Sequence, residues 1–269
     1  MAPTIDRYFP EPLAAKVPDV TLVFWVIKIL TTAAGEAASD YLSLHNHIVG
    51  GAVEIALVAL ALVIQLRVPR YAAPAYWFLA LAIAVAGTGL SDTMHLTLGI
   101  PYLGTTVFWA VVLAGIFWLW DRSEHTLSIH SIVTRRRETF YWATVFATFA
   151  LGTALGDFTA NALGFGYLAS GIAFAVIILI PAVAWRFFGL NEVLAFWAAY
   201  VVTRPLGASF ADYFSKPRDI SGVGFGDGPT AVVLMAAVAV LVAGVTVTGH
   251  GIQPAGSTDP PAGRGRGAR

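Results

Sequence analysis

Cysteine is absent from this chain of 269 residues, and charged residues make up only 12% of it. The lack of thiols excludes disulfides, thiolate nucleophiles, iron–sulfur clusters and thiolate-rich metal sites. The formal net charge is zero, so no overall attraction to nucleic acid is expected. No phosphate-cradling Gly-Lys motif occurs, and histidines paired within a membrane span are missing. Neither a bound nucleotide nor a haem is therefore expected.

Apolar sequence is what the chain has in abundance, with 57% hydrophobic residues and a mean hydropathy of +0.72. A helix that crosses a bilayer needs about 20 mainly apolar residues. The sequence predicts an all-α integral membrane protein with eight transmembrane helices. The predicted spans are residues 20–44, 48–66, 74–98, 102–120, 139–163, 167–188, 191–215 and 229–248.

The distribution of Lys and Arg between the loops predicts the orientation, because cytoplasmic loops carry an excess of both. Arginines follow the second span, separate the fourth from the fifth, and recur in the tail, whereas the opposite loops contain only Lys216 and Arg218. Both termini are therefore expected in the cytoplasm. The predicted organisation is a cytoplasmic N-terminal segment 1–19, a four-helix half 20–120, a cytoplasmic connector 121–138, a second half 139–250 and a disordered cytoplasmic tail 251–269.

The odd-numbered spans share one pattern, reading WVIKILTTAAGEAASD, WFLALAIAVAGTGLSD, WATVFATFALGTALGD and WAAYVVTRPLGASFAD. Each begins with Trp, has Gly ten residues later and ends with Asp five residues after that. This is a fourfold duplication of a helical hairpin. Because each repeat contains two helices, all four enter from the same side, which predicts parallel repeats in a pseudo-fourfold, two-by-two arrangement. The aspartates are Asp40, Asp92, Asp157 and Asp212.

The three repeated residue types suggest different roles. A Trp near the start of each helix suits the headgroup boundary, and the glycines Gly35, Gly87, Gly152 and Gly207 allow close helix packing. The aspartates lie about 22 Å of helix rise beyond the Trp residues. Intramembrane acids normally face a bundle interior or a wet cavity, so these four are candidate ion ligands. Alternatively, they bond to neighbouring helices or reach the outer interface.

Further polar residues occur in individual repeats. Glu36 extends the set of candidate ion-binding acids, and Lys28 and Arg204 are candidate charge partners. Lys28 lies two turns before Glu36 and Arg204 two turns before Asp212, so ion pairs within each helix are expected candidates. His95 follows Asp92 by three residues, and His45 and His47 follow Asp40. Asp-x-x-His spacing can place two ligands on one metal. The alternative is ordinary interfacial histidines. Thiol-free carboxylates favour Mg²⁺, Ca²⁺ or Mn²⁺, the histidines favour a Mn-like ion, and a proton is an equally suitable ligand.

Two stretches carry a resemblance to a known family. In the first repeat these are Lys28 to Thr32 with Gly35, Glu36 and Asp40, and in the fourth the run TRPLGASFAD from Thr203 to Asp212. The sequence resembles a bacterial family described as uncharacterised membrane-anchored proteins, built from a repeat of unknown function. The resemblance implies this architecture in a cell inner membrane. After Asp40 the sequence departs from that pattern, with HNH in place of an Asn/Gly-rich loop.

These observations predict a multi-pass transporter or channel-like protein for a small cation, with export of a divalent, Mn-like metal as the specific expectation. A bound divalent cation is the candidate ligand, the bilayer is the expected partner, and the oligomeric state is left open. One alternative is a membrane enzyme that acts on a lipid or quinone, although no nucleophile motif supports it. Another is a structural or accessory membrane protein in which Asp and Gly only hold helices together.

Overall fold

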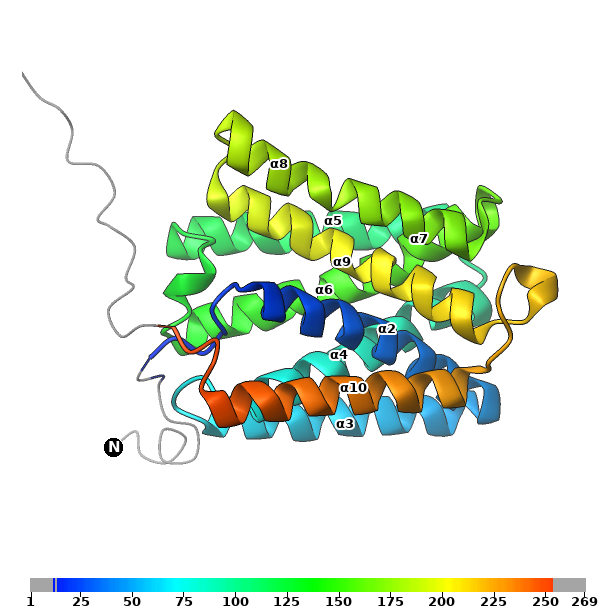
Figure 1. Ribbon diagram of the computed structural model, residues 1–269, viewed down its shortest axis with the longest axis horizontal. Helices are drawn as coiled ribbons and strands as arrows, with labels where there is room; N and C mark the ends of the chain where they lie inside the picture. Colours follow the sequence, from blue (N-terminus) through cyan, green and yellow to red (C-terminus); the bar gives the residue numbers. More distant parts are fainter. Residues whose placement is uncertain (1–11, 13, 254–269) are drawn as a thin grey trace, which may run out of the picture.

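The computed structural model describes residue 12 and residues 14–253 (Figure 1). Within this part of the chain, eight helical segments are long and apolar enough to cross a membrane. Each of them matches one of the eight predicted spans. The predicted all-helical membrane fold is therefore confirmed. The predicted N-terminal segment and tail lie largely outside the described residues.

Every repeat contributes two helical segments. The first segments are α2 (Leu22–His45), α4 (Ala73–Asp92), α6 (Arg135–Asp157) and α9 (Glu192–Ser215). The second segments are α3 (His47–Arg67), α5 (Tyr102–Glu124), α7 (Gly166–Ile177) with its continuation α8 (Leu179–Phe188), and α10 (Asp227–Thr248). Their ends define a Trp end of the bundle, where the first segments begin, and an Asp end, where they finish.

Local sequence fixes where these helices begin and end. Asn46 and Asn191 cap α3 and α9, because each side chain accepts hydrogen bonds from two backbone N–H groups in the first turn. In the second and third repeats the α-helix ends at the repeated aspartate. There it continues as a π-helical turn, η1 (Thr93–Thr97) or η3 (Phe158–Ala162). π-Helical turns are rare in proteins, and those that do occur are often found at functional sites.

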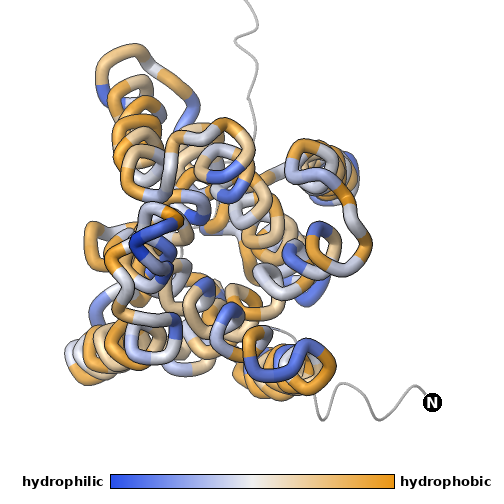
Figure 2. The backbone as a smooth tube through the Cα atoms, turned by 90° about the vertical axis from the view of Figure 1, so that its right-hand side faces the viewer, coloured by the Kyte–Doolittle hydropathy of each residue, from blue (hydrophilic) through white to orange (hydrophobic). Residues whose placement is uncertain are grey.

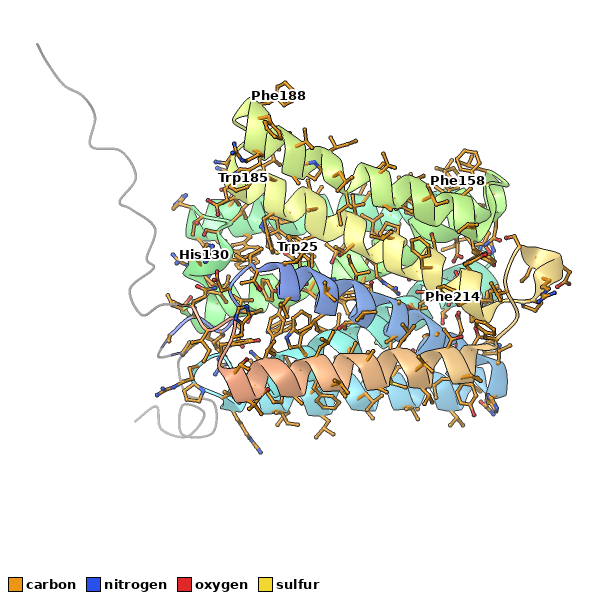
Figure 3. All side chains as sticks on the ribbon, in the orientation of Figure 1. Trp25, His130, Phe158, Trp185, Phe188 and Phe214 are labelled. Carbon is orange, nitrogen blue, oxygen red and sulfur yellow. The ribbon has the colours of Figure 1, made fainter. Side chains whose placement is uncertain are left out.

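The four first segments form an inner ring. Helix α2 contacts α4 and α9, and α6 contacts the same two helices. Between 61% and 72% of each inner span is buried, against 17% to 22% of each outer span. The outer helices are mainly hydrophobic when viewed from the Asp end (Figure 2). Phe188 of α8 is 82% exposed and points away from the bundle, as expected of a lipid-facing side chain (Figure 3).

The outer helices link one repeat to the next. Helix α3 packs mainly on α4, α5 on α6, and α7 on α9, so each second segment covers the first segment of the following repeat. The last helix, α10, packs on α2 and thereby closes the cycle. The two predicted halves, 20–120 and 139–250, are consequently joined within one continuous ring. This cyclic packing places the equivalent residues of all four repeats around a common axis.

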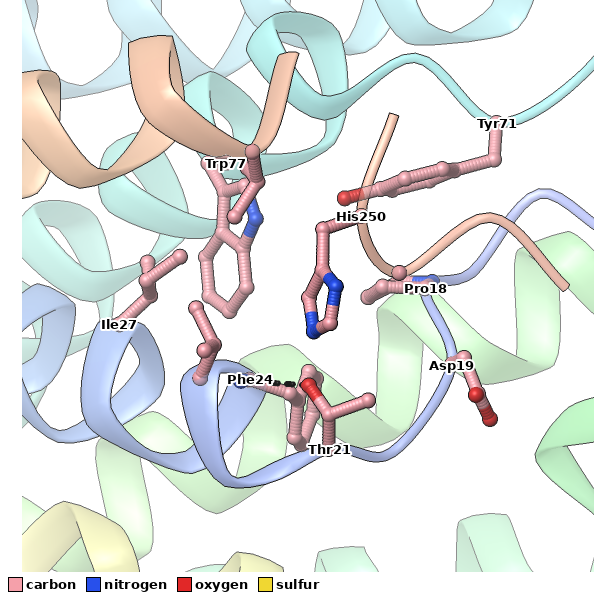
Figure 4. Close-up of a pocket in the computed structure, with 11 residues that line it drawn as sticks. Pro18, Asp19, Thr21, Phe24, Ile27, Tyr71, Trp77 and His250 are labelled. Carbon is pink, nitrogen blue, oxygen red and sulfur yellow. Dashed lines mark hydrogen bonds between the residues drawn. The ribbon is translucent and has the colours of Figure 1, made fainter. Parts of the chain in front are cut away.

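Segments far apart in the sequence meet at the Trp end. The backbone N–H of Asp19 donates to the carbonyl of Gly251 at 2.8 Å, and that of Tyr71 donates to Ala15 at 3.1 Å. His250 lies between Tyr71 and Trp77 in this corner of the molecule (Figure 4). The two ends of the described chain thus help to hold the ring closed.

The repeated tryptophans do not sit at a lipid boundary, so this prediction from the sequence was wrong. Trp77, Trp142 and Trp197 are all buried, and only Trp25 is partly exposed. Trp197, for example, packs on Trp120 of the outer helix α5 and on Tyr141 of α6, and its indole N–H donates to the carbonyl of Leu127 at 2.9 Å. Neighbouring helices and the connector thus cover this indole ring.

Candidate functional site

Residues spaced by four along the inner helices build successive layers around the central axis. Because i and i+4 share a helix face, the positions 3, 7, 11 and 15 residues after each repeated Trp point in the same direction. Position 11 is occupied by Glu36, Thr88, Thr153 and Ala208 in the four repeats. Position 15 is occupied by the four repeated aspartates. Polar groups therefore accumulate along this axis toward the Asp end.

The repeated glycines lie where neighbouring inner helices touch. A Cβ atom added to any of these glycines would overlap the residue at position 7 of the next repeat. The contacted residues are Ala84, Phe149, Arg204 and, where the fourth repeat meets the first, Thr32. The same contact thus recurs four times around the ring. Because glycine has no side chain, the helix axes approach closely enough for polar groups to meet across the centre.

Arg204 crosses the centre of the ring and binds Glu36. Its Nη2 atom lies 2.5 Å from Glu36 Oε2, and both side chains are almost completely buried. The same Nη2 donates to the hydroxyls of Thr88 and Thr153, and Nη1 donates to the carbonyl of Thr32 at 2.9 Å. Three of the four residues at position 11 therefore hold this one guanidinium. Arg204 is paired with an acid of another repeat and makes no ion pair with Asp212 among the described residues.

Three carboxylates of the inner ring meet beyond this pair. One oxygen from each of Glu36, Asp40 and Asp212 lies within 4.8 Å of the others. Lys216 follows α9, and its Nζ lies 2.7 Å from Asp40, 4.0 Å from Asp212 and 3.2 Å from Asp227. One oxygen of Asp212 is buried without a hydrogen-bond partner in the described structure.

Asp92 and Asp157 complete the group. Both are partly buried, and each interacts electrostatically with Asp40 and Glu36. Asp92, Asp157 and Asp212 thus all lie within electrostatic range of Asp40 at the Asp end. We call the set of carboxylates the acidic cluster: Glu36, Asp40, Asp92, Asp157, Asp212 and Asp227. Within the described structure its paired cations are Arg204 on one side and Lys216 on the other, so carboxyl groups outnumber the basic groups that pair with them.

The histidines lie apart from the acidic cluster. His45 and His47 are exposed at the loop between α2 and α3. His95 is stacked on Tyr102, with a ring-centroid distance of 3.6 Å, and its Nδ1 lies 2.8 Å from the carbonyl of Ile100. In the described part of the chain, the group of potential metal ligands contains carboxylates alone. An all-oxygen set of this kind suits Mg²⁺, Ca²⁺ or Mn²⁺.

Sequence reasoning missed several members of the site. Lys216 lies in the connection after α9, and Asp227 is the first residue of α10. Lys216 follows Asp212 by four residues, which was a visible signal for an ion pair. Thr88 and Thr153 share position 11 with Glu36, a correspondence that the Trp register already contained. Aligning every position of the repeat, and not only the three invariant ones, would have found both threonines.

The central axis is closed by aromatic rings toward the Trp end. Tyr76 and Tyr141 are fully buried, and their hydroxyls are hydrogen-bonded to each other. The Tyr200 hydroxyl interacts with both of them. Phe24 and Phe196 pack alongside. The acidic cluster consequently lies on one side of an aromatic barrier.

Comparison with protein families gives a match to the Repeat of Unknown Function (DUF347) at residues 23–71, 75–126, 140–190 and 195–250. Each matched segment begins two residues before its repeated Trp. The chain belongs to the DUF347 repeat family. The DUF347 match confirms the fourfold repeat and its register. Comparisons with curated proteins and with solved structures give no match. The function of this DUF347 protein must therefore be argued from its site.

Lys216 makes a testable contribution to stability at alkaline pH. Burial opposes its charge, but Asp40, Asp212 and Asp227 outweigh that effect and raise the pKa of Lys216 above its ordinary value. A raised folded-state pKa means that the stabilisation is fully present below the unfolded-state pKa of about 10.4 and is lost only at higher pH. The loss of melting temperature in Lys216→Met is therefore expected to be at least as large at about pH 9 as at about pH 7.

Melting curves of the detergent-solubilised protein at both pH values measure this difference. Arg218→Met is the matched control, because Arg218 is exposed in the same connection and forms no ion pair among the described residues. A Lys216→Met effect that shrinks as the pH rises over this range contradicts the assignment.

Proposed function

We propose that this DUF347 protein carries a cation across the membrane and that the acidic cluster is its binding site. The cargo that fits best is a hard divalent metal ion such as Mg²⁺, Ca²⁺ or Mn²⁺, and Mn²⁺ is the ion used in the flux test below. The observation that carries the proposal is the excess of carboxylates over basic groups on the axis of the ring. Carboxylates that lie this close together within a membrane are neutralised by a bound cation or by protons, and a metal ion can displace those protons. In a purely structural ion-pair network, acidic and basic groups are equal in number. Here the carboxylates outnumber the basic groups, so a further cation can bind.

The ligand chemistry supports a hard divalent ion as cargo. Glu36, Asp40 and Asp212 each place an oxygen within 4.8 Å of the others. The Oδ1 atom of Asp212 accepts no hydrogen bond from the described residues and lies 4.0 Å from Lys216 Nζ, so it is available to a ligand. Asp92 and Asp157 add negative potential. Lys216 balances part of that charge when no cargo is present. A cation that enters must compete with Lys216 for Asp40 and with Arg204 for Glu36.

The orientation is part of the proposal. From the Arg distribution, the Trp end and both termini face the cytoplasm, and the acidic cluster faces the outside of a bacterial inner membrane. The aromatic barrier closes the cytoplasmic side in this conformation. Transport then requires the barrier formed by Tyr76, Tyr141 and Tyr200 to open after the cation has bound.

Manganese flux into proteoliposomes tests the function. A Mn²⁺-quenched dye sealed inside the vesicles reports entry. We expect the double variant Asp40→Asn/Asp212→Asn to transport at least about tenfold more slowly than the wild-type protein, because the loss of a charge-assisted metal contact is worth about 1.4 kcal/mol or more.

Asp219→Asn is the matched control, since Asp219 is an exposed acid in the same outer connection. It should transport at the wild-type rate. Melting temperatures of all three proteins separate lost flux from lost fold. Wild-type flux in the double variant, or no flux in the wild-type protein, overturns the proposed function.

A further inference from the structure

Lys28 is a basic group that the acidic cluster does not use. Its side chain is completely buried in the second turn of α2, three residues after Trp25. The Nζ atom has no hydrogen-bond partner in the described structure. It lies 4.0 Å from the ring centroid of Phe149 and 4.2 Å from that of Tyr200. Lys28 is thus held by two aromatic faces and not by an acid.

The groups around Lys28 come from the other three inner helices. Arg204 of α9 lies within electrostatic range and carries the same sign of charge. Tyr200 also lies on α9, one turn before Arg204. Tyr76 of α4 and Tyr141 of α6 lie one turn nearer the Trp end, at the position before each Trp, and both interact with the Tyr200 hydroxyl. None of these groups is an anionic partner. A second positive charge beside Arg204 is therefore balanced poorly.

We propose that Lys28 is a proton-binding site and that it loses its proton when a cation binds in the acidic cluster. This inference rests on the proposed function and adds its coupling, with the proton as the exchanged ion. The Trp-side location separates the proton site from the cation site. The carrier would then exchange a metal ion bound by the acidic cluster for a proton bound by the Lys28 amine.

Charge balance along the axis links the two sites. In the structure, Glu36 neutralises Arg204. A cation that takes over the Glu36 carboxylate leaves Arg204 without its counter-ion. The guanidinium cannot lose its proton under ordinary conditions, whereas an amine can. An N–H bond of Lys28 therefore breaks, Nζ keeps the electron pair, and the proton leaves to water at the Trp end. The hydroxyls of Tyr200, Tyr76 and Tyr141 are the hydrogen-bonding groups that lie in that direction.

The chain is well suited to a direct test because it contains only three lysines, Lys16, Lys28 and Lys216. Labelling the full-length protein with [13Cε,15Nζ]-lysine therefore gives three side-chain NMR signals, whose positions differ between ammonium and amine. Lys28→Arg and Lys216→Arg variants assign two of them. Lys216 reports on the acidic cluster, since it contacts Asp40 at 2.7 Å. Lys16 is paired with Glu138 at the Trp end and serves as the reference.

Mn²⁺ is paramagnetic and broadens nearby signals, so the diamagnetic ion Mg²⁺ is the probe at one fixed pH. We expect Mg²⁺ to shift the Lys216 signal and to move the Lys28 signal toward the amine position, while Lys16 stays in place. In Asp40→Asn/Asp212→Asn, Mg²⁺ should leave Lys28 unchanged. If Lys216 shifts and Lys28 does not, the proton site is wrong and the cation site stands. If neither signal moves, the cation site itself is overturned, and the coupling falls with it.

Discussion

Replacing Arg204 by Met is expected to destabilise the protein by about 3–5 kcal/mol, which is the usual effect of removing one partner of a buried ion pair. The methionine keeps most of the aliphatic stem that packs on Gly152, so packing changes little. Glu36 is left as an uncompensated charge among Thr88 and Thr153. Thermal or denaturant unfolding of the solubilised protein measures the loss.

A second substitution separates the contribution of the ion pair to stability from the contribution of packing. Arg204→Met/Glu36→Gln removes both charges and keeps a hydrogen-bonding side chain beside the two threonines. This double variant should be more stable than Arg204→Met alone, because no unpaired charge stays buried. Arg186→Met is the control at an exposed arginine and should change stability by less than about 0.5 kcal/mol. Equal effects at positions 204 and 186 contradict the role given to the ion pair.

Replacing Gly207 by Val is expected to destabilise the ring by about 3 kcal/mol or to prevent folding. Its added Cβ would overlap the side chain of Thr32 and approach the backbone nitrogen of Ala33. Overpacking usually costs about 1–3 kcal/mol, and here the neighbour includes backbone, which cannot rotate away. The contact also lies beside the carbonyl of Thr32 that holds Arg204. The variant therefore disturbs the fold and the ion pair together.

Gly244→Val provides the comparison within a membrane helix. Gly244 lies in α10, and a Cβ added there would meet nothing within 4 Å. Val also has a slightly higher helix propensity than Gly. We expect wild-type expression and melting temperature for Gly244→Val. Fluorescence-detected gel filtration of both variants in detergent measures the recovery of folded protein. Similar recovery of the two would show that the glycine contacts do not determine the packing of the ring.

Much of the architecture could be predicted from the sequence because its signals are local. Eight apolar stretches of spanning length gave the helices, and the Trp/Gly/Asp register gave the fourfold repeat. Parallel repeats also put equivalent residues at the same depth, which agrees with the approach of Asp40 and Asp212 to within 4.8 Å of each other beside Glu36. The register cannot say which outer helix covers which inner one. That α10 packs on α2, for example, depends on contacts between the two ends of the chain.

The details of the site depended on side chains that meet across the ring. Pairing along one helix suggested that Arg204 and Lys28 would find acids two turns away. In the structure Arg204 reaches Glu36 in another repeat, and Lys28 packs on Phe149 and Tyr200. Similarly, the spacing of Asp92 and His95 suggested a shared metal, but a π-helical turn begins between them and His95 stacks on Tyr102 instead. Contacts across the ring overruled spacing for Arg204 and Lys28, whereas local backbone geometry did so for His95.

The most direct test of the central claim is a measurement of Mn²⁺ binding to the purified protein. Electron paramagnetic resonance measures free Mn²⁺, and the decrease on adding protein gives the bound fraction. The proposal predicts saturable binding to the wild-type protein and to Asp219→Asn, and at least about tenfold weaker binding to Asp40→Asn/Asp212→Asn. Wild-type affinity in that double variant, or no saturable binding by the wild-type protein, contradicts the assignment of the acidic cluster as a cation site.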